Sequence, residues 1–206
     1  MPRTRVKRKI KIERKTKETQ ISCALNIDGK GQTQIDTGIG LLDHMIELFT
    51  FHGLFDLKLK VIRSDLKVDL HHTNEDVGIV LGQAFKKALG RMQGISRFGF
   101  ASVPMEDVLA RVTLDISGRG YFRLKTGKGV VAPKLEQGYA FTDVEHFFEG
   151  FAKHLGMNLN ITVDRLSPDL HTTLEPIFKA LGLALDQATQ IDPRRKGIPS
   201  TKGIID

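Results

Sequence analysis

The 206-residue chain has few of the features on which disulfide-rich and membrane-spanning proteins depend. It contains one cysteine, Cys23, so no disulfide can form within the chain, and a reducing cytoplasm is the simplest compartment to expect. No stretch approaches the roughly 20 apolar residues of a membrane-spanning helix, and we expect no signal peptide. A chain of this length can bury enough surface to fold without a disulfide or a structural metal.

Acidic residues are scarce only at the N-terminus. The net charge of +7 looks like a nucleic-acid signature, but residues 1–17 alone hold nine Lys and Arg residues against one Glu. The other 189 residues hold 22 basic and 23 acidic side chains, so the rest of the chain is nearly neutral. Few aromatic residues accompany the charges of this arm, which disfavours a nucleic-acid surface. Residues 5–12 are therefore predicted to form an edge strand covered with Lys and Arg.

Apolar residues alternate with polar ones in some stretches and recur with helical spacing in others, which predicts an α+β fold. The predicted strands are residues 21–28, 57–61, 108–116 and 159–163, and the predicted helices lie around 42–52, 75–90, 144–155 and 175–189. Residues 117–120 form a turn signal, and residues 125–137, rich in Gly and Lys, are predicted to form a surface loop.

Segments of the first half recur in the second half at an offset of about 100 residues. Residues 42–49 (LDHMIELF) match 144–151 (VEHFFEGF), and residues 69–75 (DLHHTNE) match 169–175 (DLHTTLE). This repeat predicts two fused copies of one unit, each an antiparallel sheet with helices packed on one face. We assign residues 1–95 to the first half, 96–192 to the second, and 193–206 to a C-terminal tail that closes over an anion.

All seven histidines belong to this repeat, because His52 and His154 each follow one of the matched segments by three residues. Histidine is the commonest metal-ligating side chain, and the spacing of three or four residues to a Glu places both groups on one helix face. A set of His and Glu without Cys favours Mn²⁺, Fe²⁺ or Zn²⁺, held by two metal sites or by one shared site. The candidate ligands are His44, His71, His72, Glu75, His146, His171 and Glu175. His52 and His154 have no adjacent acid and are interpreted as structural.

Several further motifs occur in a specific order along nearly the whole chain. They include residues 37–45 (TGIGLLDHM), 71–78 (HHTNEDVG), 117–119 (SGR), 144–148 (VEHFF) and 198–203 (IPSTKG). With these motifs the chain resembles the imidazoleglycerol-phosphate dehydratase family. The resemblance implies a hydro-lyase that converts imidazole glycerol phosphate to imidazole acetol phosphate in histidine biosynthesis.

The resemblance also implies a structure and a set of site residues. Each half is expected to resemble the second domain of ribosomal protein S5, and trimers are expected to assemble into a 24-subunit homo-oligomer. The expected cofactor is Mn²⁺, with two ions per active site held by the seven candidate ligands above. Glu18 matches a substrate-contacting acid, and Glu18 or Glu175 is expected to move a proton during catalysis. The phosphate is expected to contact Arg97, Arg119, Lys179, Ser200 and Lys202, which offer the donors that an anion needs.

The sequence departs from the family pattern at three positions near the expected metal. Thr172 stands where a second histidine is usual, Leu70 replaces an acid, and Leu48 replaces a glutamine. The missing imidazole predicts that one of the two ions is held weakly. Two alternatives remain: a paralogue that binds a phosphorylated small molecule without dehydrating it, and an S5-like nucleic-acid module that uses residues 3–17. The second alternative predicts RNA binding that depends steeply on salt and is lost when the arm is deleted.

Overall fold

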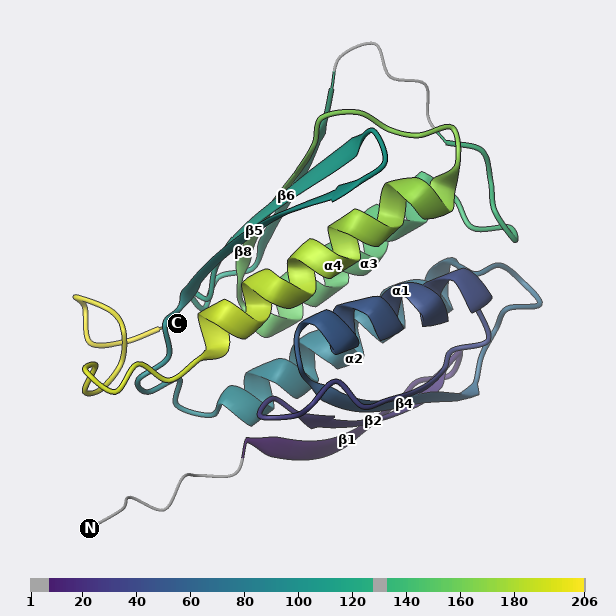
Figure 1. The fold of residues 1–206 in the computed structure, drawn as a ribbon. Helices are drawn as coiled ribbons and strands as arrows, with labels where there is room; N and C mark the ends of the chain where they lie inside the picture. The colour runs from purple at the N-terminus through teal and green to yellow at the C-terminus, as the bar shows by residue number, and fades with distance from the viewer. Residues whose placement is uncertain (1–7, 128–132, 206) are drawn as a thin grey trace.

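The computed structural model describes residues 8–127 and 133–205 and arranges them in four layers (Figure 1). The outer layers are two four-stranded sheets, and four helices lie between them. The first sheet has the order β1-β2-β4-β3, with strands Lys9–Lys15, Gln20–Asn26, Asp56–Arg63 and Thr33–Asp36. The second has the order β5-β6-β8-β7, with strands Phe98–Met105, Val108–Asp115, Asn158–Val163 and Tyr121–Thr126. The helices are α1 (Gly40–His52), α2 (His71–Leu89), α3 (Phe141–Leu155) and α4 (Leu170–Thr189).

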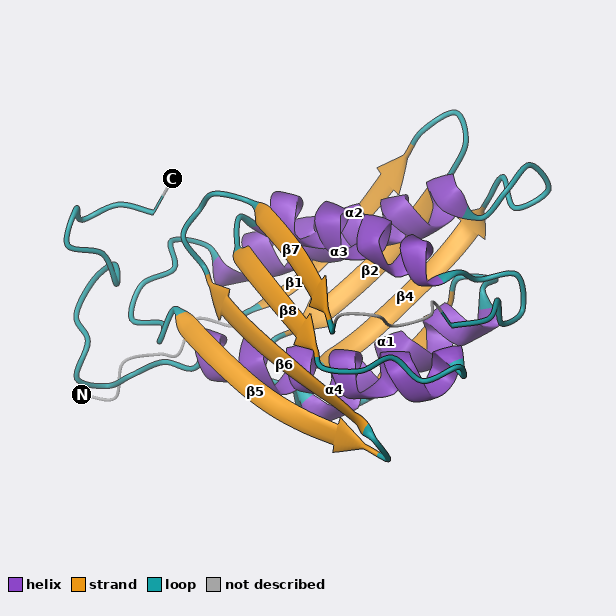
Figure 2. Cartoon of the chain, turned by 90° about the horizontal axis from the view of Figure 1, so that it is seen from above, coloured by secondary structure: helices purple, strands orange, loops and turns teal. Residues whose placement is uncertain are grey.

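The two sheets share one topology, which confirms the predicted duplication. Figure 2, seen from above, shows the second sheet over the helices and the first sheet behind them. The expectation of purely antiparallel sheets is wrong for one strand pair in each, because β3 pairs parallel with β4 and β7 pairs parallel with β8. Helix α1 connects β3 to β4 and α3 connects β7 to β8, and parallel neighbours require such a crossover. The boundaries proposed at residues 95 and 192 stay a prediction.

The alternating residues of each sheet divide between the core and the outer surface. On β2, Ile21, Cys23 and Leu25 are buried against the helices, while Ser22 and Ala24 lie on the outer face. Burial raises the pKa of the Cys23 thiol to about 12, so this cysteine is a core residue. Strand β1 lies at the edge of its sheet, as predicted, although it begins at Lys9 and residues 5–7 lie outside the described part.

The observed elements differ from the predicted ones in two ways. The helices begin earlier, and some weakly buried strands were not predicted. The four helices begin two to five residues earlier than their apolar spacing indicates. Before α2, Asp69 accepts a hydrogen bond from the His71 backbone N–H at 2.5 Å, and before α4, Asp169 accepts one from the Thr172 N–H at 2.7 Å. Strands β3, β5 and β7 contain at most one fully buried residue each and were not predicted. Strand β7 extends into the predicted 125–137 loop, of which residues 128–132 lie outside the described part.

Helices from opposite halves pack in pairs, α1 with α4 and α2 with α3. Glycines allow the close approach. A Cβ atom on Gly78 of α2 would lie 2.3 Å from the Phe147 carbonyl oxygen of α3. A Cβ atom on Gly182 of α4 would lie 2.4 Å from the Phe49 carbonyl oxygen of α1. Each pair therefore joins the first helix of one half to the second helix of the other half. No helix in the described ranges is both long and apolar enough to cross a membrane.

The Gly78→Ala substitution should destabilise the fold, because the added methyl group overlaps a backbone carbonyl that cannot rotate away. We expect the free energy of unfolding to fall by about 1–3 kcal/mol, as in other overpacked cores. Gly150→Ala, in the same helix pair, is the matched control, since its Cβ atom would lie 3.2 Å from the Glu75 carbonyl oxygen. Denaturant unfolding of metal-free protein at one fixed concentration measures both. Equal stability of the two variants would contradict this account of the helix pair.

Candidate metal and phosphate sites

The pairing of α1 with α4 brings His44 from the first half to His171 and Glu175 from the second. The His171 Nε2 atom lies 2.7 Å from Glu175 Oε1, and the His44 Nε2 atom lies 3.3 Å from the same oxygen. The two imidazole rings stack with their centroids 4.8 Å apart. One ligand atom from each residue lies within 4.8 Å of the others, so the three can face one ion. We call these residues the α1·α4 cluster.

Glu175 is the electrostatic centre of the α1·α4 cluster. Its side chain is 11% exposed, and burial by itself would raise the pKa of the carboxyl group. Hydrogen bonds from Lys179, His44 and His171 outweigh that effect and lower the pKa to about 2. The Lys179 ammonium contacts the Glu175 Oε2 atom directly. Glu175 is therefore ionised at neutral pH and offers a carboxylate to a cation.

The pairing of α2 with α3 forms a second cluster from the repeat-related residues. The His71 and His146 rings meet edge to face with centroids 4.4 Å apart, and His71 Nε2 lies 3.9 Å from Glu75 Oε2. The His146 Nδ1 atom is buried and has no hydrogen-bond partner in the described part of the chain. We call His71, Glu75 and His146 the α2·α3 cluster. The repeat equates its members with His171, Glu175 and His44, so each cluster combines residues of both halves.

The side chain of His72 contacts neither cluster through a recorded hydrogen bond or ion pair. Its Nδ1 atom lies 2.6 Å from Asp65 Oδ2 and 3.9 Å from Glu18 Oε2. The hydrogen bond with Asp65 raises the pKa of His72, with a further contribution from the charge of Glu18. The same bond lowers the pKa of Asp65. Glu18 thus lies beside a candidate metal ligand, on the loop between β1 and β2.

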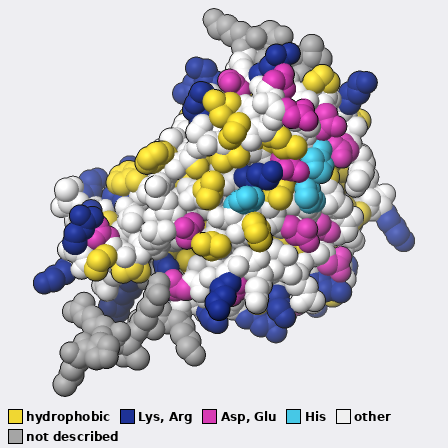
Figure 3. Space-filling view, viewed as in Figure 1, with side chains coloured by type: hydrophobic (Ala, Val, Ile, Leu, Met, Phe, Trp, Pro, Cys, Tyr) yellow, Lys and Arg dark blue, Asp and Glu magenta, His cyan; other side chains and the backbone are white. Residues whose placement is uncertain are grey.

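The three departures from the family pattern have clear structural positions. Thr172, in the place of a second histidine, is buried in the first turn of α4. Leu48 and Leu70 are partly buried and pack against the hydrophobic core. None of them adds a charged ligand. Figure 3 shows the histidines gathered on one face beside acidic side chains and a basic one.

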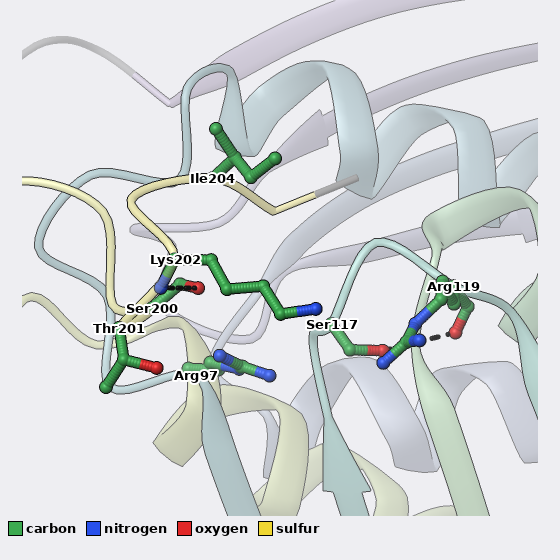
Figure 4. Close-up of a pocket in the computed structure, with 7 residues that line it drawn as sticks. All are labelled: Arg97, Ser117, Arg119, Ser200, Thr201, Lys202 and Ile204. Atoms are coloured by element: carbon green, nitrogen blue, oxygen red, sulfur yellow. Dashed lines mark hydrogen bonds between the residues drawn. The ribbon is translucent and has the colours of Figure 1, made fainter.

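A basic cavity of about 170 Å³ lies between the C-terminal tail and the second sheet (Figure 4). It is lined by four of the predicted phosphate residues and by three others: Arg97, Ser117, Arg119, Ser200, Thr201, Lys202 and Ile204. The Lys202, Arg97 and Arg119 side chains extend into the same space (Figure 4). Lys179 is not among the lining residues, because its ammonium group pairs with Glu175.

Arg97 connects the tail to the second sheet. Its Nε and Nη2 atoms donate to the two carboxylate oxygens of Asp115 at 2.6 and 3.0 Å, and this pairing raises the pKa of Arg97. Its Nη1 atom donates to the Pro199 carbonyl oxygen at 2.9 Å. Three donors of the guanidinium are thus used within the protein. Arg119 and Lys202 have no recorded side-chain partner among the described residues, and they are the freer cations of this cavity.

Sequence reasoning missed several residues of these sites, namely Asp65, Asp115, Glu136, Ser117 and Thr201. Glu136 accepts a hydrogen bond from the His171 backbone N–H at 3.1 Å. Asp65 and Asp115 carried a weak signal, because each is an acid at or just after the end of a predicted strand, close to a motif residue. Of the two histidines interpreted as structural, His154 contacts the Gly150 carbonyl oxygen at 3.0 Å, and His52 lies against Phe51.

Comparisons with known proteins identify one family over most of the chain. A family model described as imidazoleglycerol-phosphate dehydratase matches residues 37–185. A protein of that name from Citrifermentans bemidjiense is 51% identical over 193 residues, 93% of this chain and 96% of its own length. Another, from Thermoanaerobacter sp., is 50% identical over 198 residues, 96% of this chain and 100% of its own length.

Two solved structures that resemble this fold belong to the same family as the sequence relatives. The structure of IGPD from Pyrococcus furiosus in complex with (S)-C348 matches with a TM-score of 0.77 and 32% identity, covering 94% of this chain and 99% of that one. Imidazoleglycerol-phosphate dehydratase from Staphylococcus aureus matches with a TM-score of 0.75 and 31% identity, covering 89% and 99%. The similarity therefore includes both halves of the fold.

Removing the Lys179 ammonium tests the electrostatics of the α1·α4 cluster. A carboxyl group whose pKa falls from 4.5 to about 2 on folding stabilises the protein fully above pH 4.5, and this contribution is lost as the pH falls towards 2. Lys179→Met should reduce that pH dependence and lower the unfolding free energy of metal-free protein at pH 7 by about 1–3 kcal/mol. Denaturant unfolding between pH 7 and pH 2 measures it, with the exposed Lys86→Met as control. A pH profile identical to that of the wild type would contradict the assignment.

Proposed function

Because the chain belongs to the imidazoleglycerol-phosphate dehydratase family, a family of hydro-lyases in histidine biosynthesis, we propose that both of its clusters bind divalent metal ions for this dehydration. The observation that carries the proposal is the pair of repeat-related clusters, each with two imidazoles and one carboxylate from opposite halves. The identity over nearly the full chain favours the enzyme over both alternatives, the paralogue that only binds and the nucleic-acid module.

The donor chemistry of both clusters fits such an ion. Imidazole and carboxylate ligands suit Mn²⁺, Fe²⁺ and Zn²⁺, and no thiolate is present to favour a softer ion. The buried His146 Nδ1 atom lacks a hydrogen-bond partner in the described ranges, as expected of a ring nitrogen reserved for a ligand. We propose Mn²⁺ and two ions per active site. Thr172, which supplies no imidazole, makes one of the two the weaker.

The substrate contains a proton on carbon with no adjacent carbonyl group, so a base alone removes it with difficulty. A divalent ion, when bound, acts as a Lewis acid that polarises the substrate imidazole. Glu175, with a pKa of about 2, is a poor proton donor or acceptor near neutral pH and serves as a ligand. Glu18, whose side chain is 57% exposed, is then the acid that moves a substrate proton.

The basic cavity serves to bind the phosphate. Arg119 and Lys202 supply charge, and the Ser200 hydroxyl group supplies a neutral donor, while the Ser117 hydroxyl donates to the Arg119 carbonyl oxygen at 3.3 Å. Arg97, held by Asp115, fixes the tail through the Pro199 carbonyl oxygen and so keeps Ser200 and Lys202 at the cavity. Lys179 belongs to the metal cluster in this proposal, since it balances the charge of Glu175.

We also propose that the chain assembles into a homo-oligomer, a 24-subunit particle built from trimers. Its proposed location is the cytoplasm. Large apolar side chains on the surface support an assembly. Phe98 and Phe100 on the outer face of β5 are 59% and 70% exposed, and Phe51 at the end of α1 is 62% exposed. Exposed aromatic groups of this size are typical of surfaces that meet another chain.

Three carboxylate substitutions test the assigned roles together. Glu175→Gln and Glu75→Gln should each weaken one ion and lower the turnover of imidazole glycerol phosphate at least about 100-fold, because each removes a charged ligand. Glu18→Gln should leave both ions bound and still lower turnover by about 10²–10⁴, the range expected for a lost acid or base. Equilibrium dialysis with Mn²⁺ counts the ions, and steady-state kinetics measures turnover.

Glu106→Gln is the matched control, since Glu106 is exposed in the turn between β5 and β6 and should change neither quantity. Full ion binding by both Glu175→Gln and Glu75→Gln would contradict the proposed ligands. Glu18→Gln protein with the turnover and substrate affinity of the wild type would remove Glu18 from the reaction.

A further inference from the structure

Asp65 makes the shortest recorded contact to any histidine side chain in the described ranges. Its Oδ2 atom lies 2.6 Å from His72 Nδ1, and its Oδ1 atom accepts a hydrogen bond from the Thr73 hydroxyl at 3.2 Å. Thr73 is fully buried, and the Asp65 side chain is 13% exposed. The carboxylate is therefore fixed from one side by a rigid helix residue and faces the imidazole with its other oxygen.

This contact determines the proton distribution on the His72 ring. A carboxylate oxygen accepts hydrogen bonds, so the proton of neutral His72 lies on Nδ1. The lone pair is then on Nε2, at the opposite side of the ring. Metal-ligating histidines in proteins almost always donate their second ring N–H to a carboxylate, a carbonyl or a water, and such partners typically change metal affinity 10–100-fold.

The internal repeat supports a specific link between the two residues. In the register that aligns residues 69–75 with 169–175, Thr172 stands in the place of His72 and Arg165 in the place of Asp65. Arg165 instead forms an exposed ion pair with Asp107, at 3.1 Å. Thr173, the counterpart of Thr73, bonds with the Ser167 backbone. The second half therefore lacks both members of the pair, as expected if the carboxylate serves the imidazole.

We propose that Asp65 is a positioning residue, which holds His72 with Nδ1 protonated so that Nε2 is available to a divalent ion. The inference rests on the proposed function, because it assumes that His72 is a metal ligand. Glu18 lies 3.9 Å from the same Nδ1 atom, too far for a hydrogen bond, and does not replace Asp65 in this role.

The alternative is that Asp65 binds an ion itself, together with Glu18 and His72, whose ligand atoms also lie within 4.8 Å of one another. A double-mutant cycle separates the two roles. A positioning residue acts only through His72, so its loss has no further effect once the imidazole is gone. A ligand acts independently of that imidazole, and its loss lowers the affinity for the ion in either background.

The experiment measures Mn²⁺ dissociation constants by equilibrium dialysis for the full chain and for Asp65→Asn, His72→Gln and the double variant. We expect Asp65→Asn to lower the Mn²⁺ affinity of the affected site roughly 10–100-fold. In the His72→Gln background the same substitution should change the affinity less than about twofold. Asp107→Asn, which removes an exposed carboxylate, is the matched control and should bind Mn²⁺ as the wild type does.

Two results would overturn the inference: unchanged affinity in Asp65→Asn, or a loss of similar size in both backgrounds. If wild-type protein bound no Mn²⁺, the proposed function itself would fail, which is a distinguishable outcome. Thermal unfolding of the metal-free variants shows whether Asp65→Asn folds. If it does not, Thr73→Ser and Thr73→Val provide a second test, with Mn²⁺ affinity retained by the serine and lowered by the valine variant. Equal affinity of those two would also overturn it.

Discussion

The close packing of helices from opposite halves is the constraint on which both metal clusters depend. The four helices lie between two sheets, and each sheet buries the apolar faces of the helices from its own half. Across the middle of the molecule, α1 meets α4 and α2 meets α3, with glycines where the backbones approach most closely. This arrangement brings a histidine from one half to the His and Glu of the other. Neither half alone contains a complete set of ligands.

Charge is distributed differently at the metal clusters and at the phosphate cavity. Around Glu175, a buried carboxylate is surrounded by two imidazoles and one ammonium group, which keep it ionised. At the cavity, the cations come from the residue before β5, from the turn after β6 and from the tail, and Asp115 pairs with only the first of them, Arg97. The surroundings of Glu175 suit a cation and an imidazole that binds to it, and the phosphate cavity suits an anion. A substrate with an imidazole at one end and a phosphate at the other matches both kinds of group.

The sequence predicted the repeat, the α+β class, most strands and the candidate ligands. Histidines next to acids at repeated positions are a local signal that a single sequence shows, and the structure brings six of the seven candidate ligands, all but His72, into the two clusters. The family resemblance added the phosphate residues, of which four line one cavity. Short strands such as β3 and β7 were missed, because their half-exposed residues carry no strong period.

Tertiary contacts explain what the sequence did not provide. Nothing local indicates that His44 lies against α4 rather than α2, since that choice depends on how the two layers of helices pack. The same holds for Lys179, expected at the phosphate but paired with Glu175 one helical turn away. Asp65 and Asp115 carried only a weak signal in the sequence, and their contacts with His72 and Arg97 appear only in the structure. Residues that position other residues have no motif of their own.

If the two clusters hold the catalytic ions, dehydration depends on the binding of those ions. The most direct measurement is a titration of metal-stripped wild-type protein with Mn²⁺, in which bound ion and turnover of imidazole glycerol phosphate are followed in the same samples. We expect no turnover without the ion, and a rate that rises with ion binding and reaches its limit when both clusters are filled. Full turnover by folded protein freed of metal would contradict it, as would saturated binding of Mn²⁺ with no turnover.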